Sequence, residues 1–305
     1  MPELPEVHAL ATGLGTRLIG RTLERVDVVA FAALKTFAPP VSALAGGQFT
    51  GVARHGKFLD FTVADVSSHE QDNGRLHLIV HLARAGWIRW RDGPPPPPSG
   101  RPGKGPLAAR VVLAASADGS LAGGAGLDIT EAGTKKSLAL YVVADPHDVP
   151  GIARLGPDPL ADDFTLHRFA EILADAGRSQ IKGVLRNQSV IAGIGNAYSD
   201  EILHAAKMSP FKPAAMSADE TGRLFDAMQS TLRSAVARAD GLDATELKRE
   251  KKSNLQVHGR VGEKCPVCGD TIRQVIFADS TLQYCPTCQT GGKPLADRVL
   301  SRLLK

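Results

Sequence analysis

The chain has 305 residues, enough for two domains of ordinary size, and 43% of them are hydrophobic while 22% are charged, so it should fold. No apolar run approaches the roughly 20 residues of a membrane span, and the first residues lack the basic and apolar segments of a secretory signal. This pattern argues against membrane and secreted proteins, and we expect a soluble, cytoplasmic protein.

The positive charge is concentrated towards the C-terminal end. Residues 241–305 contain 11 Lys and Arg against 7 Asp and Glu, which accounts for the whole net charge of +4. A basic terminal region is typical of proteins that bind a polyanion such as nucleic acid. A solvated charged face would have the same composition, so charge alone leaves both interpretations open.

The first seven residues, MPELPEV, hold two prolines and two glutamates. Apolar residues then recur at helical spacing as far as Leu18, and Pro5 suits a first helical turn, so a helix is expected from Glu6. Removal of the initiator Met would expose the secondary amine of Pro2. An α-amino group titrates near about pH 7.7–8.0, so a usable fraction would be neutral and nucleophilic. The alternative is that Pro2 only starts the helix.

Strand patterns follow between about residues 20 and 145. The clearest stretches are 57–63, 75–82, 109–116 and 138–143, and in the second of these Leu residues and one Val alternate on one face. Residues 93–106 read GPPPPPSGRPGKGP. A run of five prolines cannot pair in a sheet and favours polyproline II, so this segment is expected to be a surface insertion.

Helical patterns dominate after the turn-rich segment 156–163. The expected helices span 164–177, 180–188, 196–207 and 218–240. We therefore divide the chain into an N-terminal domain (1–155), a helical domain (156–254), a zinc finger (255–289) and a C-terminal tail (290–305).

The only four cysteines are paired in two Cys-x2-Cys motifs separated by 16 residues, and they are Cys265, Cys268, Cys285 and Cys288. Two thiolates three positions apart can bind one side of a tetrahedral ion, and a second such pair completes the coordination. The segment between the motifs is expected to be a β-hairpin. Disulfides are the less favoured alternative, because the chain is expected to be cytosolic. Sulfur fills all four positions, which predicts a structural Zn²⁺.

Several motifs occur in an order that resembles the formamidopyrimidine-DNA glycosylase/endonuclease VIII family. They are PELPEV, RHGKF, HLARAG, LGPDPL, IKGVLRNQSVIAGIGNAYSDEIL, VHGR and the finger with four cysteines. The resemblance implies an α+β protein with an N-terminal β-sandwich flanked by helices, followed by a helix-two-turn-helix domain with a four-cysteine zinc-finger hairpin. It also implies a monomeric bifunctional DNA glycosylase/AP lyase acting on damaged double-stranded DNA. The alternative function is a non-catalytic zinc protein that binds damaged DNA.

The resemblance assigns catalytic roles to four residues. Pro2 would be the nucleophile that attacks C1′, and Glu3 the general acid/base beside it. Lys57 would contact phosphates and donate a proton during β-elimination, whereas a lone lysine is usually a surface residue. Glu6 would support the site, or it would be an ordinary acidic residue in a helical first turn.

Four further residues are expected to contact DNA: Lys182, Asn196, Arg84 and Arg260. Asn196 ends a glycine turn whose backbone N–H groups could approach a phosphate, and it is also a good N-cap residue, so a capped turn is the alternative. Lys182 is the weaker assignment, near the lesion pocket or the backbone. Arg260 belongs to the VHGR motif.

The sequence departs from the family pattern in three places. Ser280 stands where the family carries an Arg at the tip of the zinc hairpin, so a weaker grip on phosphates and inefficient δ-elimination are expected. Arg84, Thr134 and Lys135 replace the Met, Arg and Phe that fill the gap left by a flipped base, so a different opposite-base preference is expected. Segment 241–254 is charged and does not resemble a reader of 8-oxoguanine.

Overall fold

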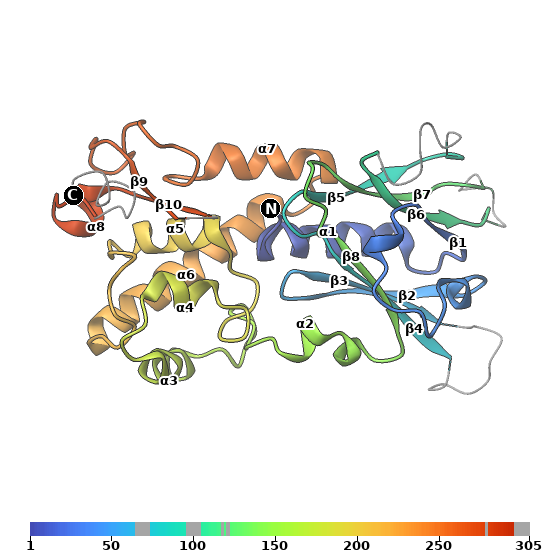
Figure 1. Ribbon diagram of the computed structural model, residues 1–305, viewed down its shortest axis with the longest axis horizontal. Coiled ribbons are helices and arrows are strands. Elements are labelled where there is room, and N and C mark those ends of the chain that lie inside the picture. Colours follow the sequence, from blue (N-terminus) through green and yellow to red (C-terminus); the bar gives the residue numbers. More distant parts are fainter. Residues whose placement is uncertain (65–73, 96–104, 117–118, 120–122, 278–279, 296–305) are drawn as a thin grey trace. The chain divides into compact units, whose positions relative to one another are not determined.

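The computed structural model describes residues 1–64, 74–95, 105–116, 119, 123–277 and 280–295. The chain divides into two compact units. The first contains residues 1–154 and 239–247, and the second contains residues 155–238 and 248–305. In Figure 1 most of the first unit is coloured blue to green, and most of the second yellow to red.

Two four-stranded antiparallel sheets form the body of the first unit. One has the order β1-β6-β7-β5 and the other β2-β3-β4-β8. Their strands are β1 (Leu23–Val28), β2 (Gln48–His55), β3 (Phe58–Ala64), β4 (Arg75–His81), β5 (Gly86–Arg91), β6 (Leu107–Leu113), β7 (Gly126–Glu131) and β8 (Ala139–Val143). The four expected strands correspond to β3, β4, β6 and β8, and the other four were missed.

Alternation of side chains places the core of this unit on one face of each sheet. In β4, Leu78 and Val80 are buried in the core, and in β3 Leu59 and Phe61 have the same orientation. Helix α1 (Leu4–Leu18) packs against β2, and its apolar residues join the same core. A β-sandwich flanked by helices was expected, and the structure confirms it.

Short helical segments complete the first unit. They are η1 (Phe31–Ala33), η2 (Val41–Leu44), η3 (Pro146–Asp148) and α2 (Pro150–Ala153). Gly151 of α2 packs against the ring of Phe58, where an added Cβ would lie 2.5 Å from the Phe58 Cζ atom. A side chain at this position would require the Phe58 ring or the helix to shift.

Helices form most of the second unit. They are α3 (Leu166–Ala176), α4 (Ile181–Arg186), α5 (Asn196–Ala205) and α6 (Ala218–Ala239), and a separate apolar core lies among them. These four helices correspond to the four expected ones. The same unit contains the hairpin of β9 (Arg273–Ile276) and β10 (Thr281–Tyr284), followed by the short helix α8 (Pro286–Thr290).

The helix α7 (Ala244–Asn254) was not expected, and its first residues belong to the first unit rather than to the helical domain. Leu247 is buried in the core of the first unit, and the Trp87 indole N–H donates a hydrogen bond to the Ala244 carbonyl at 2.8 Å. The expected domain 156–254 is therefore not continuous in the structure, because residues 239–247 pack elsewhere.

Two expectations fall partly outside the described residues. They are the proline-rich insertion, of which residues 96–104 are not described, and the C-terminal tail, of which residues 296–305 are not described. Within the described part of the chain, no helix has the length and apolar character needed to cross a membrane.

Candidate functional site

The predicted nucleophile and its acidic neighbours lie at the start of α1. Glu3 and Glu6 are buried, with only 2% and 3% of their surface exposed. They form a capping box in which the Glu6 carboxylate accepts a hydrogen bond from the Glu3 backbone N–H at 2.8 Å. Pro2 is also buried, whereas Met1 is exposed. The helix start thus brings together three of the predicted catalytic residues, and it gives Glu6 a capping contact.

Lys57 lies in the two-residue turn between β2 and β3, where Gly56 has a φ of 55°. Its side chain is buried, with 8% exposed, although lysine normally lies at the surface. Burial, together with the charge of Lys57, lowers the pKa of His81 to about 4. The predicted catalytic lysine therefore has an uncharged imidazole in its surroundings at neutral pH.

A buried carboxylate lies close to the turn of this hairpin. Asp60 accepts hydrogen bonds from His55 Nε2 at 3.0 Å and from His77 Nδ1 at 2.7 Å. Burial alone would raise the pKa of Asp60, but the two imidazole contacts outweigh it and hold this pKa below its usual value. The contacts tie β2, β3 and β4 together beside the turn that carries Lys57.

Two adjacent loops of the first unit carry the residues at the expected gap-filling positions. Arg84 is exposed in the turn that joins β4 to β5, and Thr134 and Lys135 are exposed in the loop between β7 and β8. The Ala132 backbone N–H donates to the Ala85 carbonyl at 3.2 Å, which holds the two loops side by side. The effect of these residues on opposite-base preference remains a prediction.

Asn196 is the first residue of α5, and Gly195 occupies the N-cap, so the alternative interpretation, in which Asn196 only caps the helix, is wrong. The glycine turn leads directly into the helix, so the cap falls one residue earlier. The Asn196 side-chain amide instead donates a hydrogen bond to the Thr281 carbonyl of β10 at 2.7 Å. Among the described residues its Oδ1 atom has no hydrogen-bond partner. Asn196 therefore links the turn to the zinc hairpin.

Lys182 is buried with 5% of its surface exposed. Its ammonium group donates to Asp200 Oδ1 at 2.6 Å, Ser199 Oγ at 2.7 Å and the Asn196 carbonyl at 3.2 Å. The other Asp200 oxygen accepts from His258 Nδ1 at 2.7 Å. Through these contacts Lys182 stabilises the start of α5. Its contact with DNA remains a prediction.

Glu201, the residue after Asp200, holds the loop that contains the VHGR motif. Its carboxylate accepts hydrogen bonds from the backbone N–H groups of residues 256, 257 and 258 at 2.7, 3.0 and 2.8 Å. Arg260 follows in this loop with 34% of its side chain exposed. Its guanidinium contacts Glu263 at 3.3 Å and donates to the Ser253 carbonyl at 3.2 Å.

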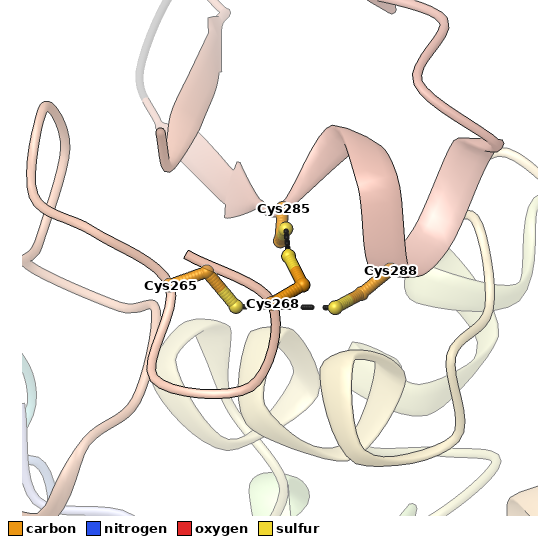
Figure 2. A group of neighbouring side chains, drawn as sticks. All are labelled: Cys265, Cys268, Cys285 and Cys288. Atoms are coloured by element: carbon orange, nitrogen blue, oxygen red, sulfur yellow. Dashed lines mark hydrogen bonds between the residues drawn. The ribbon is translucent and has the colours of Figure 1, made fainter. Parts of the chain in front are cut away.

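The four cysteines converge at the base of the β9–β10 hairpin (Figure 2). Their Sγ atoms all lie within 4.8 Å of one another. The Sγ atoms of Cys265 and Cys288 are 3.9 Å apart, and those of Cys268 and Cys285 are 3.3 Å apart. This separation suits four thiolates around one ion at Zn–S distances of about 2.3 Å, because disulfide sulfurs would lie about 2.05 Å apart.

A histidine of α5 supports this cluster. His204 is buried, and its Nε2 atom lies 3.3 Å from Cys265 Sγ. A hydrogen bond from an imidazole to a ligand sulfur fixes the orientation of that ligand. The zinc site is therefore tied to the helix that begins at Asn196.

The residues that sequence reasoning missed are His204, Asp200, Glu201 and His258. All four lie in the second unit, and three of them belong to α5. One signal was available, since two adjacent carboxylates directly precede the apolar pair Ile202 and Leu203, and such residues are seldom buried without partners. The partners themselves come from a loop more than 50 residues later, which no local pattern indicates.

Three family models match successive parts of the chain. The formamidopyrimidine-DNA glycosylase N-terminal domain matches residues 1–122, and the formamidopyrimidine-DNA glycosylase H2TH domain matches residues 155–246. The zinc finger found in FPG and IleRS matches residues 262–291. The order of the models follows the order of the structural parts described above.

The chain is 34% identical to the formamidopyrimidine-DNA glycosylase of Moorella thermoacetica over 283 residues, which cover 90% of this chain and 94% of that protein. The chain belongs to the formamidopyrimidine-DNA glycosylase family. It is also 57% identical over 152 residues to an uncharacterized formamidopyrimidine-DNA glycosylase-like protein of Mycobacterium tuberculosis. That match covers 50% of this chain and 94% of the relative.

Solved structures of the family have the same fold. The MutM (FPG) protein from Thermus thermophilus is similar with a TM-score of 0.75 and 29% identity, over 96% of this chain and 100% of that one. The Lactococcus lactis Fpg protein in complex with DNA containing an abasic site is similar with a TM-score of 0.77 and 25% identity. That match covers 94% of this chain and 99% of the other.

These matches confirm three of the sequence predictions. The protein is a DNA glycosylase of the formamidopyrimidine family, its fold is α+β with an H2TH region, and its four cysteines hold a structural zinc ion. In this family member sulfur supplies the whole donor set, so no coordination position is left for metal catalysis.

Proposed function

We propose that the protein is a bifunctional DNA glycosylase/AP lyase that removes a damaged base through a covalent Pro2 intermediate. The Pro2 nitrogen, once Met1 has been removed, attacks C1′ of the damaged nucleotide. The glycosidic C1′–N bond to the base breaks, and its electron pair leaves with the base. The Pro2 nitrogen then loses its proton and its lone pair forms the C1′=N⁺ bond as the C1′–O4′ bond breaks, with Glu3 proposed to protonate O4′, so a secondary amine gives a cationic iminium. Loss of a C2′ proton expels the 3′ phosphate, which is β-elimination.

The burial of Pro2, Glu3 and Glu6 is the observation that supports this proposal most. Chain ends are commonly frayed and idle, yet here two carboxylates and the proline are enclosed at the helix start. A buried carboxylate beside an amine can exchange protons with the departing base and with the opening sugar. Lys57, buried in the same unit, supplies the cation proposed for the elimination step.

The proposed substrate is damaged double-stranded DNA, and the proposed phosphate contacts are Asn196 and Arg260 in the second unit. The glycine turn before α5 offers backbone N–H groups, and the exposed part of Arg260 offers a guanidinium. Solved relatives include complexes with DNA that contains Fapy-dG, an abasic site or carbocyclic 8-oxoguanine. We propose that the protein acts as a monomer.

Borohydride trapping on abasic-site DNA tests the proposal. Reduction of the iminium should give a covalent protein–DNA adduct that maps to Pro2, in protein whose mass confirms the loss of Met1. A variant with one extra residue before Pro2 blocks the secondary amine and should give no adduct while still binding DNA. Failure of the processed protein to form an adduct would leave a non-catalytic binder of damaged DNA, the second function that the sequence allowed.

A further inference from the structure

We infer that α7 is a second phosphate-binding element, whose basic face grips the DNA backbone regardless of sequence or lesion. This inference rests on the proposed function, because it assumes that duplex DNA is the partner. It goes beyond that function by assigning a DNA contact to the charged segment 241–254, which does not resemble a reader of 8-oxoguanine. The proposed partner is the sugar–phosphate backbone rather than a base.

The cations of α7 are gathered on one side of the helix. Lys248, Arg249 and Lys252 are exposed, and they lie within about 100° of one another around the helix axis. The two acidic residues, Glu246 and Glu250, lie on the other side and are only partly exposed. The charge on the exposed face of the helix is therefore mainly positive.

The opposite side of α7 is fixed by specific contacts. The Glu250 carboxylate accepts a hydrogen bond from Arg238 Nε of α6 at 2.8 Å. The Lys251 ammonium lies 4.6 Å from the centre of the Tyr198 ring of α5. Figure 1 shows α7 as one continuous helix. Its basic face is therefore presented by a helix with defined rotation about its axis, which a loop would not provide.

The basic face continues into the proposed phosphate contact of the VHGR loop. The Arg260 guanidinium donates to the carbonyl of Ser253, the residue that follows Lys252. Arg260 therefore lies beside the end of α7 that carries Lys252. Lys248 and Lys252 are one helical turn apart, about 6 Å along the helix axis. Successive phosphates of one DNA strand are separated by about 3.4 Å along the duplex axis, so this spacing corresponds to about two phosphate steps.

The composition of α7 argues for backbone binding and against base reading. Lys and Arg pair with phosphates at any sequence, whereas readout of a base needs bidentate or shape-matched contacts in a groove or pocket. A solvated charged face is the competing explanation. The two explanations differ in salt dependence, because each phosphate contact releases counterions and contributes about 0.9 to the slope of log K against log salt.

The test compares the wild type with a K248Q/R249Q/K252Q variant in equilibrium binding to undamaged and abasic-site duplexes between about 50 and 200 mM salt. If all three residues contact phosphates, the slope should fall by about 2.7, so the affinity ratio of wild type to variant should shrink about 40-fold over this range. The loss should be equal on both duplexes. Unchanged circular dichroism and melting temperature would show that the variant is folded.

An R178Q/K207Q/R233Q variant removes three exposed cations from the helical part of the same unit and is the matched control. It should keep the wild-type slope. An unchanged slope in the α7 variant, or an equal fall in the control, would overturn the inference. Borohydride trapping at saturating DNA and low salt reports the proposed chemistry separately, because the α7 variant should still form the adduct there.

Discussion

At the scale of single residues, buried charges in the second unit are held by several partners each. The Lys182 ammonium and the Asp200 carboxylate are 2.6 Å apart with 6% and 1% of their side chains exposed. A buried ion pair is costly to desolvate, and it persists only when further hydrogen bonds complete it. Ser199, the Asn196 carbonyl and His258 provide those bonds. The pair therefore fixes the residue that follows the glycine turn, through the Asn196 carbonyl, and it adds little net free energy of folding.

Lys182→Met should destabilise the second unit by about 3–5 kcal/mol, because it leaves the Asp200 carboxylate buried beside a single histidine. Urea unfolding followed by a probe in the second unit measures this change. Adding Asp200→Asn should recover part of the loss, since the uncompensated charge is then removed. Lys212→Met breaks a partly exposed pair with Glu220 and should cost less than about 1 kcal/mol. Equal costs for both lysines would contradict the prediction.

His81 should make stability depend on pH in the acidic range. Its pKa in the folded protein is about 4, below the ordinary value of 6.5, because burial and the nearby Lys57 charge oppose protonation. The unfolded chain takes up the proton first, so the stability is full above pH 6.5 and falls as the pH drops towards 4. The loss should reach about 3 kcal/mol over this range.

The His81 prediction is checked by unfolding free energies at several pH values for the wild type, His81→Gln and His147→Gln. His81→Gln should remove most of the slope between pH 6.5 and 4. His147 is exposed, with 75% of its side chain accessible, so its variant should keep the wild-type slope. Parallel curves for all three proteins would show that His81 is protonated freely in the folded state.

At the scale of elements, the zinc hairpin carries Ser280 at the position where the family resemblance predicts an arginine. Ser280 directly precedes β10, and its carbonyl accepts a hydrogen bond from the Phe277 N–H at 2.8 Å. The next residue, Thr281, is held by Asn196. The side chain at position 280 thus belongs to a strand end that is anchored to the glycine turn, but serine cannot provide the cationic fork of an arginine.

Ser280→Arg should therefore raise the share of δ-elimination product on abasic-site DNA, whereas the wild type should stop mainly at the β-product. Product ends resolved on a denaturing gel distinguish the two outcomes. Ser280→Gln, which adds length without charge, is the matched control and should resemble the wild type. Predominant δ-product from the wild type would contradict the expectation for Ser280.

At the scale of the whole molecule, the proposed catalytic residues and the zinc centre belong to two different units, each with its own apolar core. The first holds Pro2, Glu3 and Lys57, and the second holds the zinc centre and the proposed phosphate contacts. Among the described residues, the apolar cluster at the cysteines contains Val257 and Ile272, and a second cluster packs Val275, Leu282 and Tyr284 of the hairpin against Phe211 and Leu295. Both clusters are small for folding this part of the chain without a metal. Metal binding must supply much of the folding free energy of this part.

Removal of zinc with a chelator should therefore unfold the hairpin and weaken DNA binding, while the sandwich of the first unit remains folded. Hydrogen exchange should show loss of protection in β9 and β10, with β3 and β4 unchanged. Native mass spectrometry should give about one zinc per chain before treatment. Full protection of the hairpin in the metal-free protein would refute this account.

The sequence by itself determined the zinc ligands and most of the long helices, because these rest on local spacing: two Cys-x2-Cys pairs and apolar periodicity. The ordered motifs along the chain indicated the family, and the proposed catalytic residues come from that resemblance and stay a prediction. Strands β1 and β2 were missed because half-exposed strands carry a weak alternation, and β5 and β7 because charged residues interrupt short apolar stretches. Helix α7 was missed because Leu247 is the only fully buried residue in its charged sequence.

Only the tertiary structure decided which partners the buried charged side chains have. Lys182, Asp200 and His258 are far apart in the sequence, and the pairing of their charges depends on how three segments pack. The same holds for Asn196, whose partner Thr281 lies 85 residues later. Long-range hydrogen bonds produce no periodic pattern in the sequence. Each needs only one polar residue, at whichever position the fold brings close to its partner.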